Sequence, residues 1–135
     1  MLELDLRRHV AQIGLEVTEE NLKLRGYTVR HNGHNDHADL VIDDTLRVEV
    51  KASLWTGHKH SRGRYQFNTR QSPDLYVLVC VGSAGHAFVI PGHVIGDRAN
   101  VAIWSQDPTA YKGQWSPYLD HWHLVKLELE RCQRD

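Results

Sequence analysis

The sequence reads LRVEVK at residues 46–51, and the alternation in this stretch decides the fold. Apolar and charged residues take turns, which predicts a β-strand with one face toward a core and one charged face. The charged face carries Arg47, Glu49 and Lys51. A carboxylate and an ammonium group are therefore expected two residues apart on the same side of one strand.

A second short strand is predicted just before it, at residues 39–42. The link between the two runs is short enough for a β-hairpin. Antiparallel pairing across this turn puts Ile42 opposite Leu46 and Asp39 opposite Glu49. Two carboxylates and a lysine are thus expected to meet where the hairpin opens.

These three groups suit the hydrolysis of a phosphodiester. Carboxylate oxygens are hard ligands for Mg²⁺, which keeps water molecules and also binds phosphate. The bound ion polarises the phosphoryl oxygen and lowers the pKa of a water molecule. Lys51 can orient or help deprotonate that water and offset charge in the transition state. A Glu-x-Lys pair alone is common on strands as a solvated ion pair, so the added aspartate favours the hydrolytic interpretation.

An amphipathic helix is expected over residues 5–25, with Asp5 capping its start and Gly26 ending it. Glu16 and Glu20 lie four residues apart and share one face of this helix. Either can add a carboxylate to the site, and the alternative is a simple surface charge. The apolar positions that predict the helix are Leu6, Val10, Ile13, Val17 and Leu24.

The rest of the chain continues the alternation of helices and strands. Residues 75–81 are nearly all apolar, which is typical of a central strand buried on both faces. Further strands are expected at residues 86–90 and 101–104, and the polar residues 52–64 are expected to form a loop. This order predicts a single α/β domain over residues 1–135 with a mixed sheet.

The C-terminal segment allows two interpretations. Ser116 and Pro117 form a helix-start signature, with a capping hydroxyl and then a proline. Apolar residues follow at helical spacing, from Leu119 to Leu129. Alternating apolar residues from Val125 onward also fit a strand, so both structures stay open for the tail.

The segment from Asp39 to Lys51 has the spacing D-x(9)-E-x-K and resembles the PD-(D/E)xK nuclease superfamily. Ala38 stands where the name of the superfamily has proline, a position that tolerates change. The preceding helix and the later runs up to residue 91 are similar to group I intron-encoded endonucleases and to Holliday-junction resolvases of this superfamily. The resemblance implies a restriction-endonuclease-like core with a mixed central β-sheet flanked by helices.

The resemblance also implies an activity and a site. The expected protein is an Mg²⁺-dependent DNA endonuclease, in which Mn²⁺ can substitute, acting on duplex or branched DNA. Glu16, Asp39 and Glu49 would ligate the metal, and together with Lys51 they form the predicted catalytic set. Cutting both strands would suit a two-fold homodimer. The alternatives are a non-catalytic nucleic-acid-binding module with the same fold and a small-molecule or metal-binding protein.

The distribution of charge is consistent with a nucleic-acid partner. The whole chain has 16 Lys and Arg against 17 Asp and Glu, a formal net charge of −1, which is not the balance of a strongly basic binder. Residues 47–70, however, hold six Lys and Arg and one acid, a net of +5. Such a local patch is the footprint expected for phosphate binding, although a solvated basic loop is the alternative. The residues predicted to contact nucleic acid are His58, Lys59, His60, Arg62, Arg64, Gln66 and Arg70.

Histidine is abundant, with ten in the chain. His31, His34 and His37 are each three residues apart in a segment rich in turn residues. This segment is expected to form a loop beside the site, where histidine contacts phosphate or titrates. A transition-metal site is the alternative.

Cysteine content and hydropathy indicate the cellular compartment to expect for the protein. Cys80 and Cys132 are isolated, so they form neither a disulfide framework nor a metal knuckle. Cys80 is expected in the core. No run reaches the roughly 18 apolar residues of a membrane span, and no signal peptide is evident at the N-terminus. A cytoplasmic protein without a membrane partner is expected.

Overall fold

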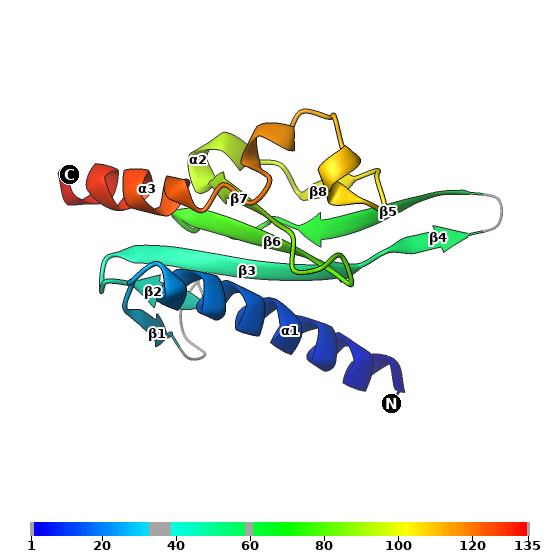
Figure 1. Cartoon of the computed structure of the whole chain (residues 1–135), viewed down its shortest axis with the longest axis horizontal. Helices are drawn as coiled ribbons and strands as arrows, with labels where there is room; N and C mark the ends of the chain where they lie inside the picture. Colours follow the sequence, from blue (N-terminus) through cyan, green and yellow to red (C-terminus); the bar gives the residue numbers. More distant parts are fainter. Residues whose placement is uncertain (1, 33–38, 59–60, 135) are drawn as a thin grey trace.

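The computed structural model describes residues 2–32, 39–58 and 61–134. A five-stranded sheet with the order β1-β2-β3-β6-β7 forms its centre (Figure 1). Strands β3 and β6 pair in parallel, and the other neighbours pair antiparallel, so the sheet is mixed. Its strands are β1 (Val29–His31), β2 (Leu40–Ile42), β3 (Leu46–Leu54), β6 (Leu75–Val81) and β7 (Ala87–Pro91).

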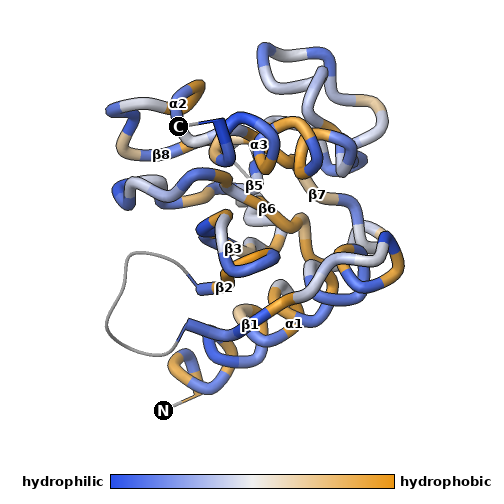
Figure 2. Tube along the Cα trace, turned by 90° about the vertical axis from the view of Figure 1, so that its left-hand side faces the viewer, coloured by the Kyte–Doolittle hydropathy of each residue, from blue (hydrophilic) through white to orange (hydrophobic). Residues whose placement is uncertain are grey.

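A smaller sheet and five helical segments complete the described part of the chain. The smaller sheet has the order β4-β5-β8. Figure 2 shows α1 on one side of strands β2 and β3, with β5 and β8 on the other. These elements are α1 (Leu2–Leu24), β4 (Thr56–His58), β5 (Ser61–Asn68), α2 (Gly92–Ile95), β8 (Asn100–Ile103), α3 (His123–Arg134) and the 3₁₀ turns η1 (Pro108–Ala110) and η2 (Ser116–Tyr118). None of the helices in the described part of the chain has the length and hydropathy needed to cross a membrane.

The hairpin predicted before LRVEVK is confirmed. Ile42 pairs with Leu46, and Leu40 pairs with Val48. The turn between the strands holds Asp43 and Asp44 at positive φ values of 49° and 54°. Two consecutive left-handed residues give the backbone twist that a tight hairpin requires.

Strand β6 separates two hydrophobic clusters, as a central strand should. Leu75 and Val77 belong to one cluster, which also contains Leu22 of α1 and Val125 of α3. Alternate residues of β6, including Cys80, belong to the other cluster, which contains side chains of β5 and β8. The prediction of a strand buried on both faces is confirmed, and Cys80 is fully buried.

Helix α1 approaches the sheet through the small residues Gly14 and Thr18, and Leu22 is its one fully buried large apolar residue. A Cβ placed on Gly14 would lie 2.8 Å from Cβ of Ala52 on β3, so only glycine allows this approach. Gly14, Thr18 and Leu22 form the buried face. Leu24, an apolar position used to predict the helix, is 77% exposed.

The ends of α1 show one correction and one confirmed expectation. The helix begins at Leu2, so Asp5 lies inside the helix and does not cap it. Gly26 adopts φ 87° and its N–H donates to the Lys23 carbonyl at 3.0 Å, which ends the helix. A glycine in this conformation satisfies a carbonyl at the helix C-terminus.

The loop predicted over residues 52–64 is wrong. Strand β3 continues to Leu54, and β4 and β5 form a hairpin that projects from the body of the molecule (Figure 1). Trp55 packs edge-on against Tyr65 with 5.3 Å between ring centroids, and Tyr65 pairs with Ile103 of β8. These tertiary contacts outweigh the weak local strand preference of a polar, glycine-containing stretch.

The helix-start signature at Ser116-Pro117 produces only the single 3₁₀ turn η2. The chain is extended at Leu119, which bridges to Phe88 of β7. The helix itself, α3, begins at His123, so the helical interpretation of the tail holds and the strand interpretation is wrong.

Candidate active site

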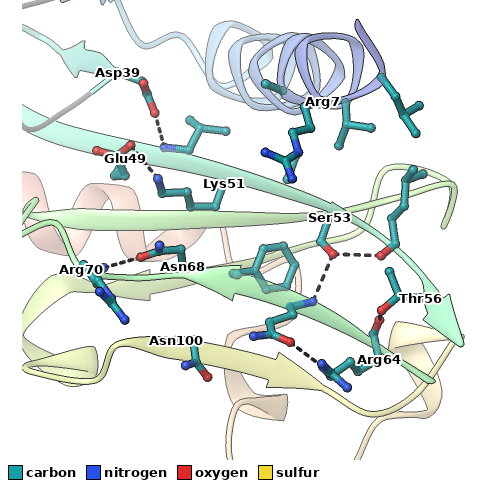
Figure 3. A pocket seen from close by; sticks show the side chains of 18 of the residues that line it. Arg7, Asp39, Glu49, Lys51, Ser53, Thr56, Arg64, Asn68, Arg70 and Asn100 are labelled. Atoms are coloured by element: carbon teal, nitrogen blue, oxygen red, sulfur yellow. Dashed lines mark hydrogen bonds and ion pairs between the residues drawn. The ribbon is translucent and has the colours of Figure 1, made fainter. Parts of the chain in front are cut away.

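The opening of the β2–β3 hairpin brings two carboxylates together. The N–H of Asp39 donates to the Val48 carbonyl at 2.9 Å, which extends the pairing by one residue beyond β2. Its carboxylate oxygen Oδ2 accepts the Val50 N–H at 2.8 Å. Asp39 is thereby fixed above β3 next to Glu49, as the hairpin register predicts (Figure 3).

Glu49 is buried at 7% exposure although it is an acid. Burial, and next its hydrogen bond with Asp39 and the negative charge of Asp39, raise the pKa of Glu49 from 4.5 to about 7. The positive charge of Lys51 acts in the opposite direction, with Nζ 3.6 Å from Oε1 of Glu49. One neighbouring ammonium does not offset a second carboxylate and desolvation together, so this pair has the electrostatic environment that a cation would relieve.

These residues lie at one end of an open groove of about 1060 Å³ between α1, β3 and β5. Its lining includes the carboxylates of Asp39 and Glu49. The positively charged lining residues are Arg7, Lys51, Arg64 and Arg70 (Figure 3). Cations outnumber carboxylates, so the groove is suited to a polyanion.

Three of the residues predicted to contact nucleic acid line this groove: Arg64, Gln66 and Arg70. Arg62 lines a different pocket, beside Trp104. Lys59 and His60 lie outside the described residues, as does the side chain of His58. His34 and His37 also fall outside them, and His31 pairs with Glu19 at 2.5 Å.

The structure does not bring the helix glutamates to Asp39 and Glu49. Glu16 is exposed and accepts a hydrogen bond from Gln12 at 3.2 Å. It lies two residues from Gly14, which faces the sheet, and two residues correspond to about 200° around a helix. Glu20 lines a separate pocket. The prediction of a helix glutamate in the site fails because Gly14 sets the rotation of α1.

Helix α1 instead contributes Arg7, which sequence reasoning did not identify. Ser53, Asn68 and Asn100 are further groove residues that it missed. A signal was present on β5, where polar residues recur at every second position from Arg62 to Arg70. This alternation marks one face of a strand, and the expectation of a loop concealed it.

The donor set fits a magnesium-type ion. Within the described parts of the chain, no three His, Cys, Asp or Glu side chains form a metal-binding group. Asp39 and Glu49 provide two carboxylates, and Mg²⁺ is usually held by one or two carboxylates together with water and substrate phosphates. A zinc site of four nitrogen or sulfur ligands does not match this pair.

Comparison with known proteins identifies the fold. No family model matches the chain. No curated protein matches it either. The chain is similar to the solved structure of a bacterial homing endonuclease, I-Ssp6803I, with a TM-score of 0.72 and 20% sequence identity over 93% of this chain and 94% of that chain. The mixed α/β fold, a central sheet flanked by helices, is therefore confirmed as one shared with a homing endonuclease.

Proposed function

We propose that the protein is a metal-dependent DNA endonuclease of the PD-(D/E)xK type that hydrolyses phosphodiester bonds with Mg²⁺, for which Mn²⁺ can substitute. The observation that carries the proposal is the buried Glu49 held beside Asp39, with Lys51 3.6 Å away, in a cation-rich groove. The likeness to a homing endonuclease structure supports it.

Asp39 and Glu49 would hold the metal ion. When bound, the ion would polarise a phosphoryl oxygen and lower the pKa of a water molecule. The Val50 N–H fixes Oδ2 of Asp39 at 2.8 Å, so this carboxylate is oriented before any ligand arrives. An oriented donor needs little reorganisation on binding.

Lys51 acts at the reacting phosphate. Its ammonium group stands on the same face of β3 as Glu49 and reaches into the groove. There it can orient the attacking water and offset the negative charge that grows on the phosphoryl oxygens. Arg7, Arg64 and Arg70 line the same groove and would bind neighbouring phosphates.

One chain carries one such carboxylate pair among its described residues. Cleavage of both strands of a duplex, or symmetric resolution of a branched junction, would suit an assembly with two active sites. A two-fold homodimer would supply them, and this is the assembly we propose for the active form.

The test uses a supercoiled plasmid and a four-way junction, each incubated with and without Mg²⁺. Lys51→Ala and Glu49→Ala are compared with wild type and with Lys126→Ala, an exposed lysine of α3 as matched control. We expect Mg²⁺-dependent cutting that falls at least about 100-fold in both site variants and persists in the control. DNA binding without cutting, unaltered by either site substitution, would instead establish a non-catalytic binding module.

A further inference from the structure

A second pocket, of about 630 Å³, lies where β8 runs into the segment that carries η1. Its lining includes Arg62 of β5, Trp104, Tyr111 and Lys112. Two of the described residues that line it are cations and none is a carboxylate. This composition favours an anionic ligand.

Trp104 is an unusual residue to leave at a surface. It is 40% exposed, the one aromatic among the exposed large apolar side chains of the described residues. The guanidinium carbons of Arg62 and Arg64 lie 5.4 and 5.3 Å from its ring centroid. Cation–π contacts at this distance hold both side chains in place while their N–H groups stay available.

Arg64 connects this pocket to the groove. Its Nε donates to Oε1 of Gln66 at 2.5 Å, and the backbone N–H of Gln66 donates to Oγ of Ser53 at 3.1 Å. Ser53 lies two residues beyond Lys51 on β3. A series of polar contacts therefore leads from Ser53, near the proposed catalytic lysine, through Gln66 and Arg64 to Trp104.

The separation of Arg62 and Gln66 along β5 can be compared with the spacing of phosphates on DNA. Arg62 and Gln66 are four residues apart on β5, which corresponds to about 13 Å along a strand. One strand of B-DNA carries a phosphate about every 3.4 Å of helix axis. Where β5 runs along the helix axis of the DNA, a phosphate held at Arg62 would lie about four nucleotides from one held beside Gln66.

Hydrogen bonds hold the segment around the pocket in one conformation. Asp107 caps η1, accepting from the N–H and the hydroxyl of Thr109 at 3.0 and 2.7 Å. The Tyr65 hydroxyl donates to the Gln106 carbonyl at 2.8 Å. The carboxylate of Asp107 therefore accepts hydrogen bonds within its own loop, and the pocket is formed without a ligand.

We propose that Arg62 and Lys112 form a second phosphate-binding subsite for the same DNA strand, beyond the groove that holds the proposed cleavage position. Trp104 is a positioning residue that aligns Arg62 and Arg64 through its ring. The proposal rests on the proposed function for its substrate, and it extends the contact surface beyond the groove.

The experiment measures the binding of a fluorescein-labelled 30-base-pair duplex by anisotropy over a series of NaCl concentrations in Ca²⁺, alongside cleavage in Mg²⁺. Arg62→Ala and Lys112→Ala should each weaken binding and lower the slope of log K against log salt by about 0.9. Trp104→Ala should lower it by up to twice as much, because two arginines lose their support, and Trp104→Phe should restore most of the affinity. The matched control is again Lys126→Ala, and thermal melts verify that each variant is folded.

Each outcome decides between the two proposals. If wild type binds and cuts DNA but the Arg62 and Lys112 variants keep its affinity and salt slope, the subsite is overturned and the nuclease stands. If those variants lose affinity and slope in a protein that never cuts, the subsite stands and the nuclease does not. If wild type binds no DNA, both are overturned.

Discussion

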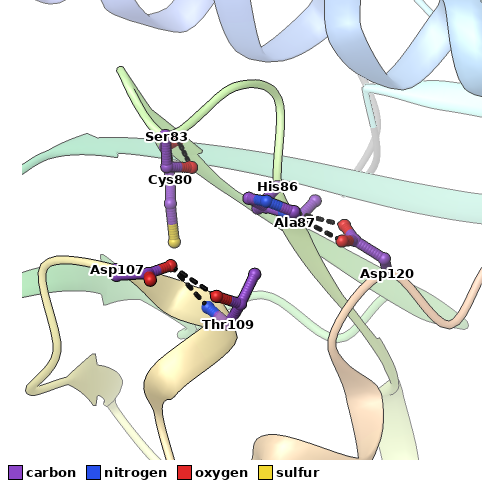
Figure 4. Close-up of polar contacts among 7 residues, drawn as sticks. All are labelled: Cys80, Ser83, His86, Ala87, Asp107, Thr109 and Asp120. Atoms are coloured by element: carbon purple, nitrogen blue, oxygen red, sulfur yellow. Dashed lines mark hydrogen bonds and ion pairs between the residues drawn. The ribbon is translucent and has the colours of Figure 1, made fainter.

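Two acidic centres of the molecule differ in how their carboxylates are partnered: Glu49 with Asp39 in the groove, and Asp120 beside β7. In the groove, Glu49 is buried beside another carboxylate, Asp39, and among the described residues its cationic neighbour is Lys51, at 3.6 Å. Asp120, which precedes α3, contacts the start of β7, and each of its carboxylate oxygens has a donor there (Figure 4). Oδ1 accepts the Ala87 N–H at 2.9 Å, and Oδ2 lies 2.5 Å from Nδ1 of His86.

The backbone of Asp120 completes that second centre. Its N–H donates to the Ala87 carbonyl at 2.6 Å, and its φ of 50° turns the chain toward α3. Main chain and side chain together tie this turn to β7. The difference teaches that an acid surrounded by donors joins two segments of a fold, whereas an acid held against another acid has a raised pKa and an electrostatic environment that a cation would relieve.

The histidine–aspartate pair could be mistaken for part of a nucleophilic triad, because Cys80 and Ser83 lie in the same region (Figure 4). Burial, with a smaller contribution from the charge of Asp120, raises the pKa of the Cys80 thiol to about 12. The Ser83 hydroxyl donates to the Cys80 carbonyl at 2.6 Å. The thiol is therefore protonated near neutral pH, and the hydroxyl is occupied within its own turn.

Glu49→Gln should give the largest effect and the sharpest contrast. We expect Mg²⁺-dependent cleavage to fall at least about 100-fold, because the proposed metal site loses a charged ligand. The melting temperature in EDTA at pH 8 should rise, because an amide next to Asp39 removes a buried charge and can donate to that carboxylate. Plasmid nicking and circular dichroism melts measure the two effects.

The same chemical change at the other centre is the control for this prediction. Asp120→Asn keeps an oxygen for the Ala87 N–H and tolerates the left-handed backbone. It should leave cleavage unaltered and should not raise the melting temperature. A gain in stability at Asp120, or none at Glu49, would contradict the comparison.

The second-largest expected effect is a change with pH in the free energy of unfolding of the metal-free protein, caused by Glu49. Since the pKa of Glu49 in the folded protein is about 7 and its ordinary value is 4.5, the folded state holds more protons between these values. The free energy of unfolding should therefore decrease as pH rises through this window, by about 3 kcal/mol in all.

Urea unfolding in EDTA from pH 4.5 to 8 measures this decrease, and adding Mg²⁺ at pH 8 should reverse part of it. The matched variant is Glu49→Gln, in which the contribution of this carboxyl should disappear. A decrease of equal size in the variant would assign it to other groups.

Strand β3 was predictable because its signals are local. Alternation in residues 46–51 and a short turn before them fix the hairpin register, and the register puts Asp39 next to Glu49. The series of polar contacts from the groove to Trp104 was not predictable. It depends on β5 pairing with β8 across more than 30 residues of sequence, for which no local pattern exists.

Helix α1 shows a different limit. Its existence and its end at Gly26 follow from spacing and from a glycine stop. Its rotation does not, because the close approach of Gly14 to Ala52 outweighs the larger apolar side chains. That rotation turns Glu16 away and brings Arg7 to the groove.

Asp120→Ala should have the third-largest effect, now on stability. The variant loses the contacts to Ala87 and His86 and puts alanine at a φ of 50°. We expect the free energy of unfolding to fall by about 2 kcal/mol. Cleavage by the folded fraction should be normal. Urea titration and nicking assays at 20 °C check both, and a selective loss of cleavage would place this centre in the active site.

Arg25→Ala should give the smallest effect, at the rim of the same structural centre. The guanidinium of Arg25 lies 5.6 Å from the ring centroid of Trp122, and it donates to the Asn21 carbonyl at 3.0 Å. Exposed cation–π contacts contribute about 0.5–1 kcal/mol, so the free energy of unfolding should fall by about that amount. Arg25→Lys keeps the charge and should recover part of the loss in the same urea titration. A loss above about 2 kcal/mol would exceed what an exposed cation–π contact contributes and would contradict this prediction.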